Sequence, residues 1–302
     1  MQTLILDSSQ ISAHEECPQE WANRGLVQVD FAKVGEAMAA GTLGHKYLEI
    51  YYTVLCESDG GMKLAAETAL AFDPDAADEV DSQFPLDLAL RAKVKQRFCD
   101  YLFNYPADRD YKPAFKKVHG IAVKDGKLID VVKRDPLIEK GFSYKLFESK
   151  EYLFVLEGRI DFMGEATDGS VLWLDHKFQF RAHQLYEKSI QFRNYSLATG
   201  LNLAVINYIR LHDKLDKTTF VRQPLSFSSL EMLHWKEELI DIYVRIAKEV
   251  ASGNFPKNRN SCGGGWGRPC QYTPLCNEYH PEIRAAIQRR DFTTRREWRP
   301  WE

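Results

Sequence analysis

The sequence has no run of about 18 apolar residues, so none of its 302 residues form a segment typical of a membrane-spanning helix. Its first ten residues, MQTLILDSSQ, have neither the basic start nor the apolar core of a secretory signal. Both absences argue against membrane and exported proteins. We therefore expect a cytoplasmic protein with no membrane partner.

The sequence also lacks an excess of positive charge. Its net charge is −3, so any binding to nucleic acid must come from a local basic surface and from a metal ion. It has no repeat and no low-complexity segment, and 44% hydrophobic with 27% charged residues is ordinary for a globular protein. A chain of this length has room for one large domain or two small ones.

Cysteine is scarce and unevenly placed, with six in the chain. In a reducing cytoplasm such cysteines are more often thiols or metal ligands than disulfides. Cys56 and Cys99 lie in helical, mostly apolar surroundings, and we expect both to be packing residues. Three others lie in a glycine- and proline-rich stretch, 253–276. This stretch lacks the Gly-Lys-Ser/Thr of a P-loop, so a bound metal is the better reason for its cysteines.

The most informative stretch is EGRIDFMGEATDGSVLWLDHK, residues 157–177. It predicts two strands joined by a tight turn, because the Asp-Gly pair in ATDG is a strong hairpin signal. Asp175 and Lys177 are two apart on the second strand, so they share a face while His176 points away. The hairpin is expected to bring Asp161, on the first strand, beside Asp175.

Two close carboxylates and a lysine point to a particular chemistry. The carboxylates repel each other unless a cation lies between them. Hard divalent cations such as Mg²⁺ take oxygen ligands, commonly one or two carboxylates with phosphate oxygens and water. A lysine on the same face can orient attacking water and offset charge on a phosphate. The pattern indicates metal-dependent phosphodiester chemistry. A hairpin that carries only a surface salt bridge would contain the same residues.

These residues, in this order, resemble the core of the PD-(D/E)XK nuclease superfamily, in its RecB-like branch. GRID contains the aspartate that precedes the central motif in that family, and DHK stands where the family has (D/E)-x-K. Gly-Thr-Leu-Gly-His, ending at His45, is similar to the family's G-x-x-x-H element. Gln191 and Tyr195 are four apart, share a helical face, and match the Q-x-x-x-Y pair that marks the branch.

The resemblance implies a metal site and roles for its neighbours. The implied ligands of one or two Mg²⁺ or Mn²⁺ ions are His45, Asp161, Asp175 and the backbone carbonyl of His176. With Asp161 and Asp175, Lys177 completes the implied catalytic set, in which it orients water and stabilises negative charge. Gln191 and Tyr195 are implied to contact the DNA strand and to help hold Lys177.

The resemblance extends to the cysteines. A serine-rich opening leads to Cys17-Pro18, as in many RecB-like nucleases whose first cluster ligand lies there. The late cysteines have the spacing C-x7-C-x5-C, whereas the usual form in the family is C-x2-C-x5-C. The implied ligands of a 4Fe–4S cluster are Cys17, Cys262, Cys270 and Cys276. A structural Zn²⁺ fits the same four cysteines, and His280 could replace one of them.

For the fold, the resemblance implies an α/β protein with a restriction-endonuclease-like core. A mixed central sheet would be flanked by helices, and the cysteine cluster would join the N- and C-terminal parts. The order β-β-β-α-β around the hairpin matches the core of the superfamily. We expect a single domain over 1–302, with a mainly helical part over 1–115, a catalytic core over 117–210 and a cysteine-rich part over 224–302.

Some local features are predicted in the first half of the chain. Ser9 or Ser12 is expected to cap a first helix, and Gly41-Thr42 to begin a later one. The sequence Lys-Asp-Gly-Lys, 124–127, predicts a hairpin turn. Glu139 stands just before a strand, where some family members have an acidic ligand, but a solvated glutamate is the preferred interpretation.

Two helices are predicted in the second half. One covers about 182–200 and carries the Q-x-x-x-Y pair. The other is a long amphipathic helix over 224–252, with Ser228 and Glu231 as a capping box.

The predicted function is metal-dependent hydrolysis of DNA, which the resemblance narrows to an exonuclease of repair, recombination or phage DNA metabolism. Arginines and aromatic residues in the tail, 284–302, suit phosphates and unpaired bases, so single-stranded DNA or DNA ends are the expected substrate. The same tail could instead be a solvated end.

A helicase or recombination protein is an implied partner, in a bacterium or a phage-infected host. Two alternatives stay open: a non-catalytic DNA-binding protein of this fold, and a zinc-stabilised module that binds a protein partner.

Overall fold

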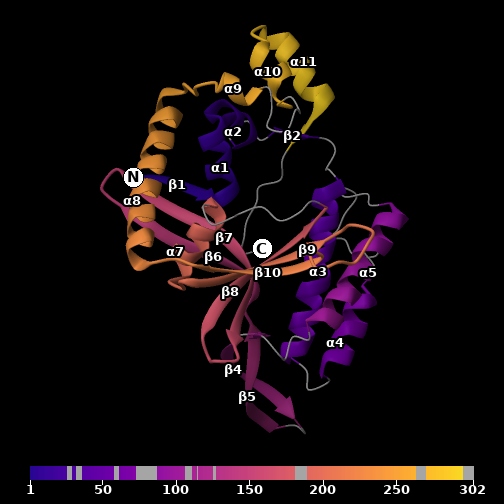
Figure 1. Cartoon of the computed structure of the whole chain (residues 1–302). Helices are drawn as coiled ribbons and strands as arrows, with labels where there is room; N and C mark the ends of the chain where they lie inside the picture. Colours follow the sequence, from indigo (N-terminus) through magenta and orange to yellow (C-terminus); the bar gives the residue numbers. More distant parts are fainter. Residues whose placement is uncertain are drawn as a thin grey trace.

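The computed structural model of the chain (Figure 1) describes residues 1–25, 29–31, 36–57, 61–72, 87–105, 111–113, 115–124, 127–180, 189–262 and 270–294. The helices are α1 (Ser8–Glu16), α2 (Pro18–Gly25), α3 (Glu36–Glu57), α4 (Gly61–Leu70), α5 (Leu88–Asn104), α7 (Ile190–Thr199), α8 (Ser229–Ser252), α9 (Arg259–Cys262), α10 (Thr273–Asn277) and α11 (Pro281–Asp291). The strands are β1 (Gln2–Asp7), β2 (Val29–Phe31), β3 (Tyr111–Pro113), β4 (Phe115–Lys124), β5 (Lys127–Pro136), β6 (Ile138–Glu148), β7 (Tyr152–Ala166), β8 (Val171–Gln179), β9 (Leu203–Arg210), β10 (Phe220–Ser226) and β11 (Phe292–Thr294). No helix within these ranges has both the length and the apolar character needed to cross a membrane.

A 7-stranded mixed sheet forms the centre of the fold. Its main path is β1–β7–β8–β9–β10, and β3 and β6 also pair with β7. β1 pairs with β7, and β8 with β9, in parallel, while the other pairs of the sheet are antiparallel. The predicted α/β class, with a mixed central sheet, is confirmed.

Helices flank this sheet on both faces. In Figure 1, α3, α4 and α5 lie along one face, and α1, α7 and α8 along the other. Each face has its own apolar cluster, because successive side chains of a strand point to opposite faces. On β8, for example, Trp173 packs in the cluster that includes Trp235 of α8, whereas Leu174 packs in the cluster that includes Phe98 of α5.

The predicted central hairpin is formed by β7 and β8. Its turn contains Gly169, whose φ of +83° is a conformation that glycine adopts without steric cost. Antiparallel pairing between the two strands runs to Phe162 and Leu174 and ends there. The order β6, β7, β8, α7, β9 follows the predicted β-β-β-α-β sequence of elements.

The start of two helices differs from the prediction. Neither Ser9 nor Ser12 caps α1, because Asp7 is the N-cap and its carboxylate accepts a hydrogen bond from the first turn. Ser9 instead donates to Asp7 Oδ1 at 2.6 Å. Asp7 is placed for this role because it is the last residue of β1. Likewise α3 begins at Glu36, so Gly41-Thr42 lies inside the helix rather than at its start.

The cap of α8 is as predicted. The hydroxyl of Ser228 accepts a hydrogen bond from the backbone N–H of Glu231 at 3.1 Å. The helix ends at Gly253, with φ of +66°. The predicted start at residue 224 is wrong: α8 begins at Ser229, and residues 220–226 form β10, a strand that was not predicted and that pairs with β9.

Two further predictions are confirmed in part. Strands β4 and β5 pair with each other as an antiparallel hairpin, which projects from the sheet in Figure 1; its turn, 125–126, lies outside the described residues. Helix α7 ends at Gly200, with φ of +70°, as expected. This helix begins at Ile190, with the extended Ser189 as its N-cap, so it starts later than the predicted residue 182; residues 182–188 lie outside the described residues.

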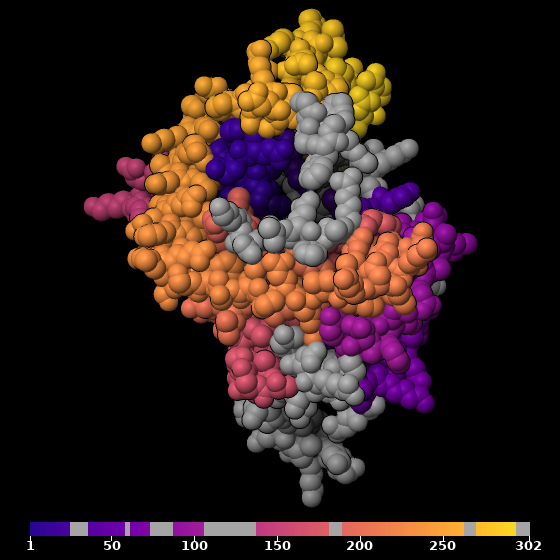
Figure 2. All heavy atoms as spheres, viewed as in Figure 1, coloured from indigo at the N-terminus to yellow at the C-terminus, as the bar shows by residue number. Residues whose placement is uncertain are grey.

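Elements that follow β1 lie side by side with elements from the end of the sequence, at the top of Figure 1. Strand β11 pairs with β2, and α2 lies beside α9 and α10 (Figures 1 and 2). Asn258 Nδ2 and the hydroxyl of Ser261 donate to the same backbone carbonyl, that of Glu16, at 2.8 and 3.0 Å. These bonds hold α9 against the end of α1.

The close approach of α3 to β8 depends on Gly44. A Cβ atom at this position would lie 2.4 Å from the ring of Phe178, which is far inside van der Waals contact. Phe178 is itself buried, so its ring has little room to move. The missing side chain at Gly44 therefore determines how near α3, and with it His45, comes to the sheet.

Replacing Gly44 by Ala is expected to lower the free energy of unfolding by roughly 1–3 kcal/mol, because overpacking displaces side chains and backbone. Gly41 is a matched control on the same helix, since a Cβ there would lie 3.9 Å from the carbonyl oxygen of Phe178. Gly41→Ala should instead raise stability by about 0.5–1 kcal/mol, because Ala is the better helix former. Urea unfolding of both variants measures the difference, and equal effects at the two positions would contradict this packing account.

Candidate metal centre

Three carboxylates form a row across neighbouring strands of the sheet. In the β6–β7 pair Ile138 lies opposite Phe162 and Lys140 opposite Ile160, so Glu139 comes beside Asp161. Asp161 and Asp175 lie directly beyond Phe162 and Leu174, the last β7–β8 pair. Directly opposite residues of a sheet have neighbouring side chains. The row therefore concentrates acidic oxygens at one place, where the β7–β8 ladder has just ended.

Asp161 occupies the gap that opens between β7 and β8. Beyond the last ladder pair, its Oδ2 accepts a hydrogen bond from the backbone N–H of His176 at 2.8 Å. Asp161 is 9% exposed, so this bond satisfies a carboxylate that has little contact with water. The side chain thus continues the connection between the two strands after the backbone bonds stop.

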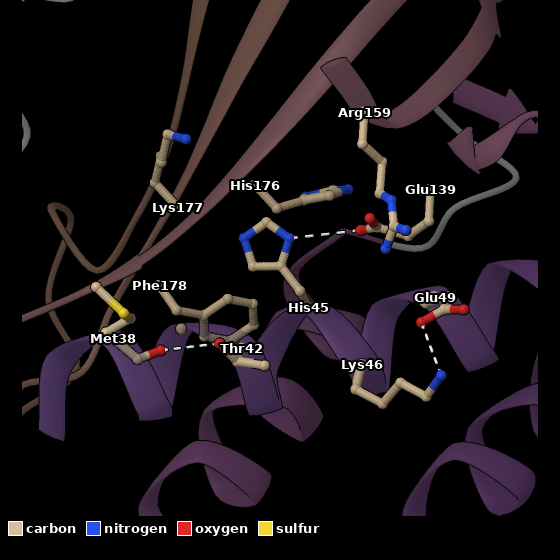
Figure 3. Close-up of a pocket in the computed structure, with 11 residues that line it drawn as sticks. Met38, Thr42, His45, Lys46, Glu49, Glu139, Arg159, His176, Lys177 and Phe178 are labelled. Carbon is tan, nitrogen blue, oxygen red and sulfur yellow. Dashed lines mark hydrogen bonds and ion pairs between the residues drawn. The ribbon is translucent and has the colours of Figure 1, made fainter. Parts of the chain in front are cut away.

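His45 of α3 completes a compact group with two of these carboxylates. Its Nδ1 lies 3.4 Å from Asp161 Oδ2 and 3.6 Å from Glu139 Oε1. One ligand atom from each of the three residues lies within 4.8 Å of the others, and no other trio of His, Cys, Asp or Glu in the described ranges does so. Figure 3 shows the His45 ring facing Glu139, with Lys177 pointing away from this pair. An imidazole and two carboxylates are a donor set that suits Mn²⁺ and Mg²⁺.

Glu139 is the residue of this group that the sequence did not identify. The preferred interpretation, a solvated glutamate, is wrong, because its side chain is only 19% exposed and faces His45. Its φ of +48° is the only positive value among the described residues other than glycine. Such a backbone is unfavourable for a residue with a Cβ, and it persists where the surroundings hold it, often at functional sites. No sequence spacing signals this conformation.

The other site residues predicted from the sequence form a second, adjoining group. Lys177 Nζ lies 2.6 Å from Asp175 Oδ2 and donates to Gln191 Oε1 at 3.3 Å. Gln191 Nε2 donates to Asp175 Oδ1 at 3.2 Å and to the hydroxyl of Tyr195 at 2.7 Å. Gln191 and Tyr195 come from one face of α7, so this helix holds the Asp175–Lys177 pair in place. Asp161, beside Asp175, links this group to His45 and Glu139.

Burial and neighbouring charges shift the pKa values of these groups. Burial raises the pKa of Asp175 to about 6, against the opposing effect of Lys177, and it also raises the pKa of Asp161. Burial alone would lower the pKa of His45, but Asp161 and Glu139 outweigh it and raise this pKa to about 9. In the metal-free protein at neutral pH, a protonated His45 therefore supplies the positive charge between the two carboxylates.

Metal binding at this group is expected to compete with the proton on His45. Between the pKa of Asp175, about 6, and that of His45, about 9, affinity for Mg²⁺ should rise about tenfold per pH unit, with release of one proton, and then level off. In the absence of metal, the stability of the protein is expected to fall as the pH rises, in contrast to the rise in metal affinity. Stability due to protonated His45 is complete below its ordinary pKa of 6.5 and is lost as the pH rises through about 9. Calorimetric titration with Mg²⁺ at several pH values measures the first effect, and an affinity unchanged between pH 7 and 9 would contradict it.

A cleft of about 500 Å³ opens on this group. One wall is a face of α3, with residues at helical spacing: Met38, Gly41, Thr42, His45, Lys46 and Glu49. The other wall comes from the sheet: Glu139, Arg159, His176, Lys177 and Phe178. The cleft gives a ligand from solution access to His45, Glu139 and Lys177.

The four cysteines predicted to bind a cluster line a separate cavity of about 270 Å³: Cys17, Cys262, Cys270 and Cys276. Burial raises the pKa of both Cys270 and Cys276. Within the described part of the chain, however, no three of the four sulfurs lie within 4.8 Å of one another. The cysteines therefore share a cavity but do not form the compact cluster that was predicted.

The remaining cysteine and histidine predictions have different outcomes. Cys56 is buried in the helical layer and Cys99 is half-buried, in line with packing roles. His280 is the exposed N-cap residue of α11 and does not belong to the lining of the cysteine cavity. The alternative in which His280 replaces a cysteine is therefore not supported.

Comparison with known proteins gives distant structural likenesses alone. No protein-family model matches the sequence, and no curated protein is similar to it. The crystal structure of SSO0001 is similar at 11% identity with a TM-score of 0.26, over 35% of this chain and 48% of that one, so the match spans about half of its length. The protein named "Putative exonuclease" from Eubacterium rectale is similar at 8% identity with a TM-score of 0.41, over 84% of each chain. At these scores neither likeness bears on the function of this chain.

Proposed function

We propose that this chain is a metal-dependent deoxyribonuclease with a restriction-endonuclease-like core. The observation that carries the proposal is the convergence of His45, Glu139 and Asp161 within 4.8 Å, next to the Asp175–Lys177 pair, at the edge of an open cleft. Acidic oxygens with a nearby lysine are the groups that phosphodiester hydrolysis requires. The proposal treats the chain as a single domain, as the sequence predicts.

The donor set fits a hard divalent cation. His45, Glu139 and Asp161 would hold Mg²⁺ or Mn²⁺, and Asp175 and the backbone carbonyl of His176 are further candidate ligands. The raised pKa of His45 supports this assignment, because a protonated imidazole now supplies the positive charge at this place. When bound, the cation lowers the pKa of water and polarises a phosphoryl oxygen.

Lys177 has the position of a group that acts on water and on developing charge. Asp175 and Gln191 hold its ammonium from two directions, at 2.6 and 3.3 Å. A fixed ammonium stabilises negative charge without reorganising during the reaction. Its side chain is 23% exposed, so it reaches the cleft while its partner Asp175 stays fully buried. Lys177 would therefore orient the attacking water and stabilise the phosphate in the transition state.

For the substrate, a single DNA strand entering from an end fits these features. Gln191 is half-buried beside Lys177, whereas Tyr195 is 4% exposed and packs in the apolar layer, so of the two predicted contacts only Gln191 can reach the backbone of a DNA strand. Arg289 and Arg290 lie on α11, and the residues after 294 lie outside the described ranges, so the proposed role of the tail rests on its sequence. The net charge of −3 disfavours a broad grip on duplex DNA.

The cysteine cavity supports a second part of the proposal, a 4Fe–4S cluster bound by Cys17, Cys262, Cys270 and Cys276. The observation that supports it is that these four cysteines, from both ends of the chain, line one cavity of about 270 Å³. Such a cluster, held by thiolates, would lock the C-terminal segment onto α1 and α2. Zn²⁺ in the same cavity is the alternative.

Cleavage assays with purified protein test the nuclease proposal. Labelled linear single-stranded DNA should be degraded with Mn²⁺ or Mg²⁺, and not with EDTA. Covalently closed circular DNA of the same sequence should persist if the enzyme needs an end. Equal cutting of the circle would replace the exonuclease with an endonuclease. Tight DNA binding without cleavage would favour the non-catalytic alternative.

A further inference from the structure

A buried polar network lies beside the candidate metal centre, on the face of the sheet that α3 and α5 cover, where the rings of His45 and His176 are 6.4 Å apart. His176 Nδ1 is 2.9 Å from Asn207 Nδ2, and the same amide nitrogen donates to the hydroxyl of Tyr101 at 2.8 Å. That hydroxyl is 3.1 Å from the hydroxyl of Tyr52 and accepts from Arg222 at 3.3 Å. The network thus joins β8, β9, β10, α3 and α5.

These polar groups are unexpected in an apolar layer. Exposure is 2% for His176 and 0% for Asn207 and Tyr101, amid the cluster that contains Leu174 and Phe162. An apolar side chain in place of His176 would avoid the cost of burying an imidazole. A buried network of this kind rigidifies its surroundings when its bonds are made. Because the network lies next to the candidate metal centre, this centre is the part of the molecule that it would make rigid.

The contact with Asn207 gives one ring nitrogen of His176 its role. An amide nitrogen only donates, so the Nδ1 atom that faces Asn207 Nδ2 accepts, while Nε2 of His176 and Oδ1 of Asn207 are buried with no hydrogen-bond partner in the described part of the chain. His176 and Asn207 are also register partners in the parallel β8–β9 pair. The side-chain bond therefore ties two strands at the level where β8 has lost its pairing with β7.

The peptide of His176 lies between β9, with which β8 is paired, and Asp161 of β7. Its N–H donates to Asp161, beyond the point where the β7–β8 ladder ends at Leu174. The side chain of the same residue is held by Asn207 from β9. A shift of the ring would move the N–H, and with it the carboxylate of Asp161 that faces His45.

The same network reaches the helix that carries His45. Tyr52 lies seven residues after His45 on α3, two turns along one face of the helix. Through Tyr101 and Asn207, its hydroxyl connects α3 to the strand that positions Asp161. The network thus fixes both sides of the metal centre relative to each other, although none of its hydroxyls faces the cleft group directly.

We propose that His176 and Asn207 are positioning residues, whose buried hydrogen bond sets the geometry of Asp161 and His45 for a divalent cation. This inference rests on the proposed metal site, but it concerns affinity for the cation rather than cleavage. Groups that orient metal ligands typically change affinity or activity by about 10- to 100-fold when they are replaced.

The test is Mn²⁺ affinity, measured by the loss of the EPR signal of free Mn²⁺ on binding. His176→Leu and Asn207→Leu should each weaken Mn²⁺ binding by about 10- to 100-fold, and the double variant by little more than either alone. His176→Asn keeps an acceptor near the Nδ1 position and should restore most of the affinity. Tyr101→Phe, which removes one hydroxyl, is a milder variant in case the Leu variants do not fold.

A matched control separates positioning from stability. His14 is another buried histidine, 1% exposed, whose Nε2 is 2.7 Å from Glu249 on the other face of the sheet. His14→Leu should lower the melting temperature and leave the Mn²⁺ affinity of the folded protein unchanged. If His176→Leu and Tyr101→Phe also fold and bind Mn²⁺ as tightly as the wild type, the inference is overturned. Absence of Mn²⁺ binding by the wild type would instead reject the proposed metal site, and binding without DNA cleavage would reject only the nuclease.

Discussion

Replacing Asp175 by Asn, or Lys177 by Ala, is expected to abolish DNA cleavage while the protein stays folded. Removing the ammonium of Lys177 takes away a fixed positive charge, which should lower turnover by roughly 10²–10³-fold. Removing the charge of Asp175 also releases Lys177, because the two groups are 2.6 Å apart, so the loss should be at least as large. Turnover at saturating Mn²⁺ and DNA is the quantity to measure.

The two variants should differ in metal binding. Asp175→Asn weakens Mn²⁺ affinity if this carboxylate is a ligand, whereas Lys177→Ala leaves it unchanged or improves it. Asp168→Asn is a control on the same hairpin, since its exposed carboxylate bonds only to Ser170 in the turn. Wild-type cleavage by a folded Asp175→Asn or Lys177→Ala variant would remove these residues from the active site.

Serine at any one of the cysteine-cavity positions is expected to remove the bound cluster and to destabilise the protein strongly. The four positions are Cys17, Cys262, Cys270 and Cys276. Few apolar side chains hold the C-terminal segment, where a small cluster around Tyr272, Leu275 and Phe292 is separate from the main layers. Binding of a metal group would therefore supply much of the free energy that folds this segment. Iron, acid-labile sulfide and visible absorption of anaerobically purified protein are the measurements.

Cys56→Ser and Cys99→Ser are the controls, because both residues lie in the helical layer away from the cavity. Both variants should keep iron and colour. Stoichiometric zinc without iron, in protein never exposed to air, would favour the structural zinc site. Protein that is folded, colourless and free of both metals would contradict a metal-binding role for the cavity.

Much of the centre of this fold follows from short-range sequence rules. The Asp-Gly turn and the alternation of strand side chains predict the hairpin and place Asp175 and Lys177 on one face, as found. The i, i+4 rule likewise predicts that Gln191 and Tyr195 share a face of α7, and their side chains are hydrogen-bonded. These features depend only on residues within a few positions of one another.

What the sequence did not predict depends on distant partners. Glu139 meets Asp161 and His45 because of the β6–β7 register and its own unusual φ, which no local pattern encodes. Asp7, and not Ser9 or Ser12, caps α1 because the pairing of β1 with β7 places the last residue of β1 at the start of the helix. The cysteines gather from both ends of the chain as the resemblance implied, but their spacing within the cavity could not be read from sequence separation.

The most direct test follows Mn²⁺ occupancy and DNA cleavage in the same samples. The account predicts that the cleavage rate rises in proportion to Mn²⁺ bound at the group of His45, Glu139 and Asp161, and that EDTA abolishes both. In Asp161→Asn, binding and cleavage should disappear together at Mn²⁺ concentrations that fill the wild-type site. Cleavage that persists in EDTA, or in folded Asp161→Asn with no Mn²⁺ bound, would contradict the account.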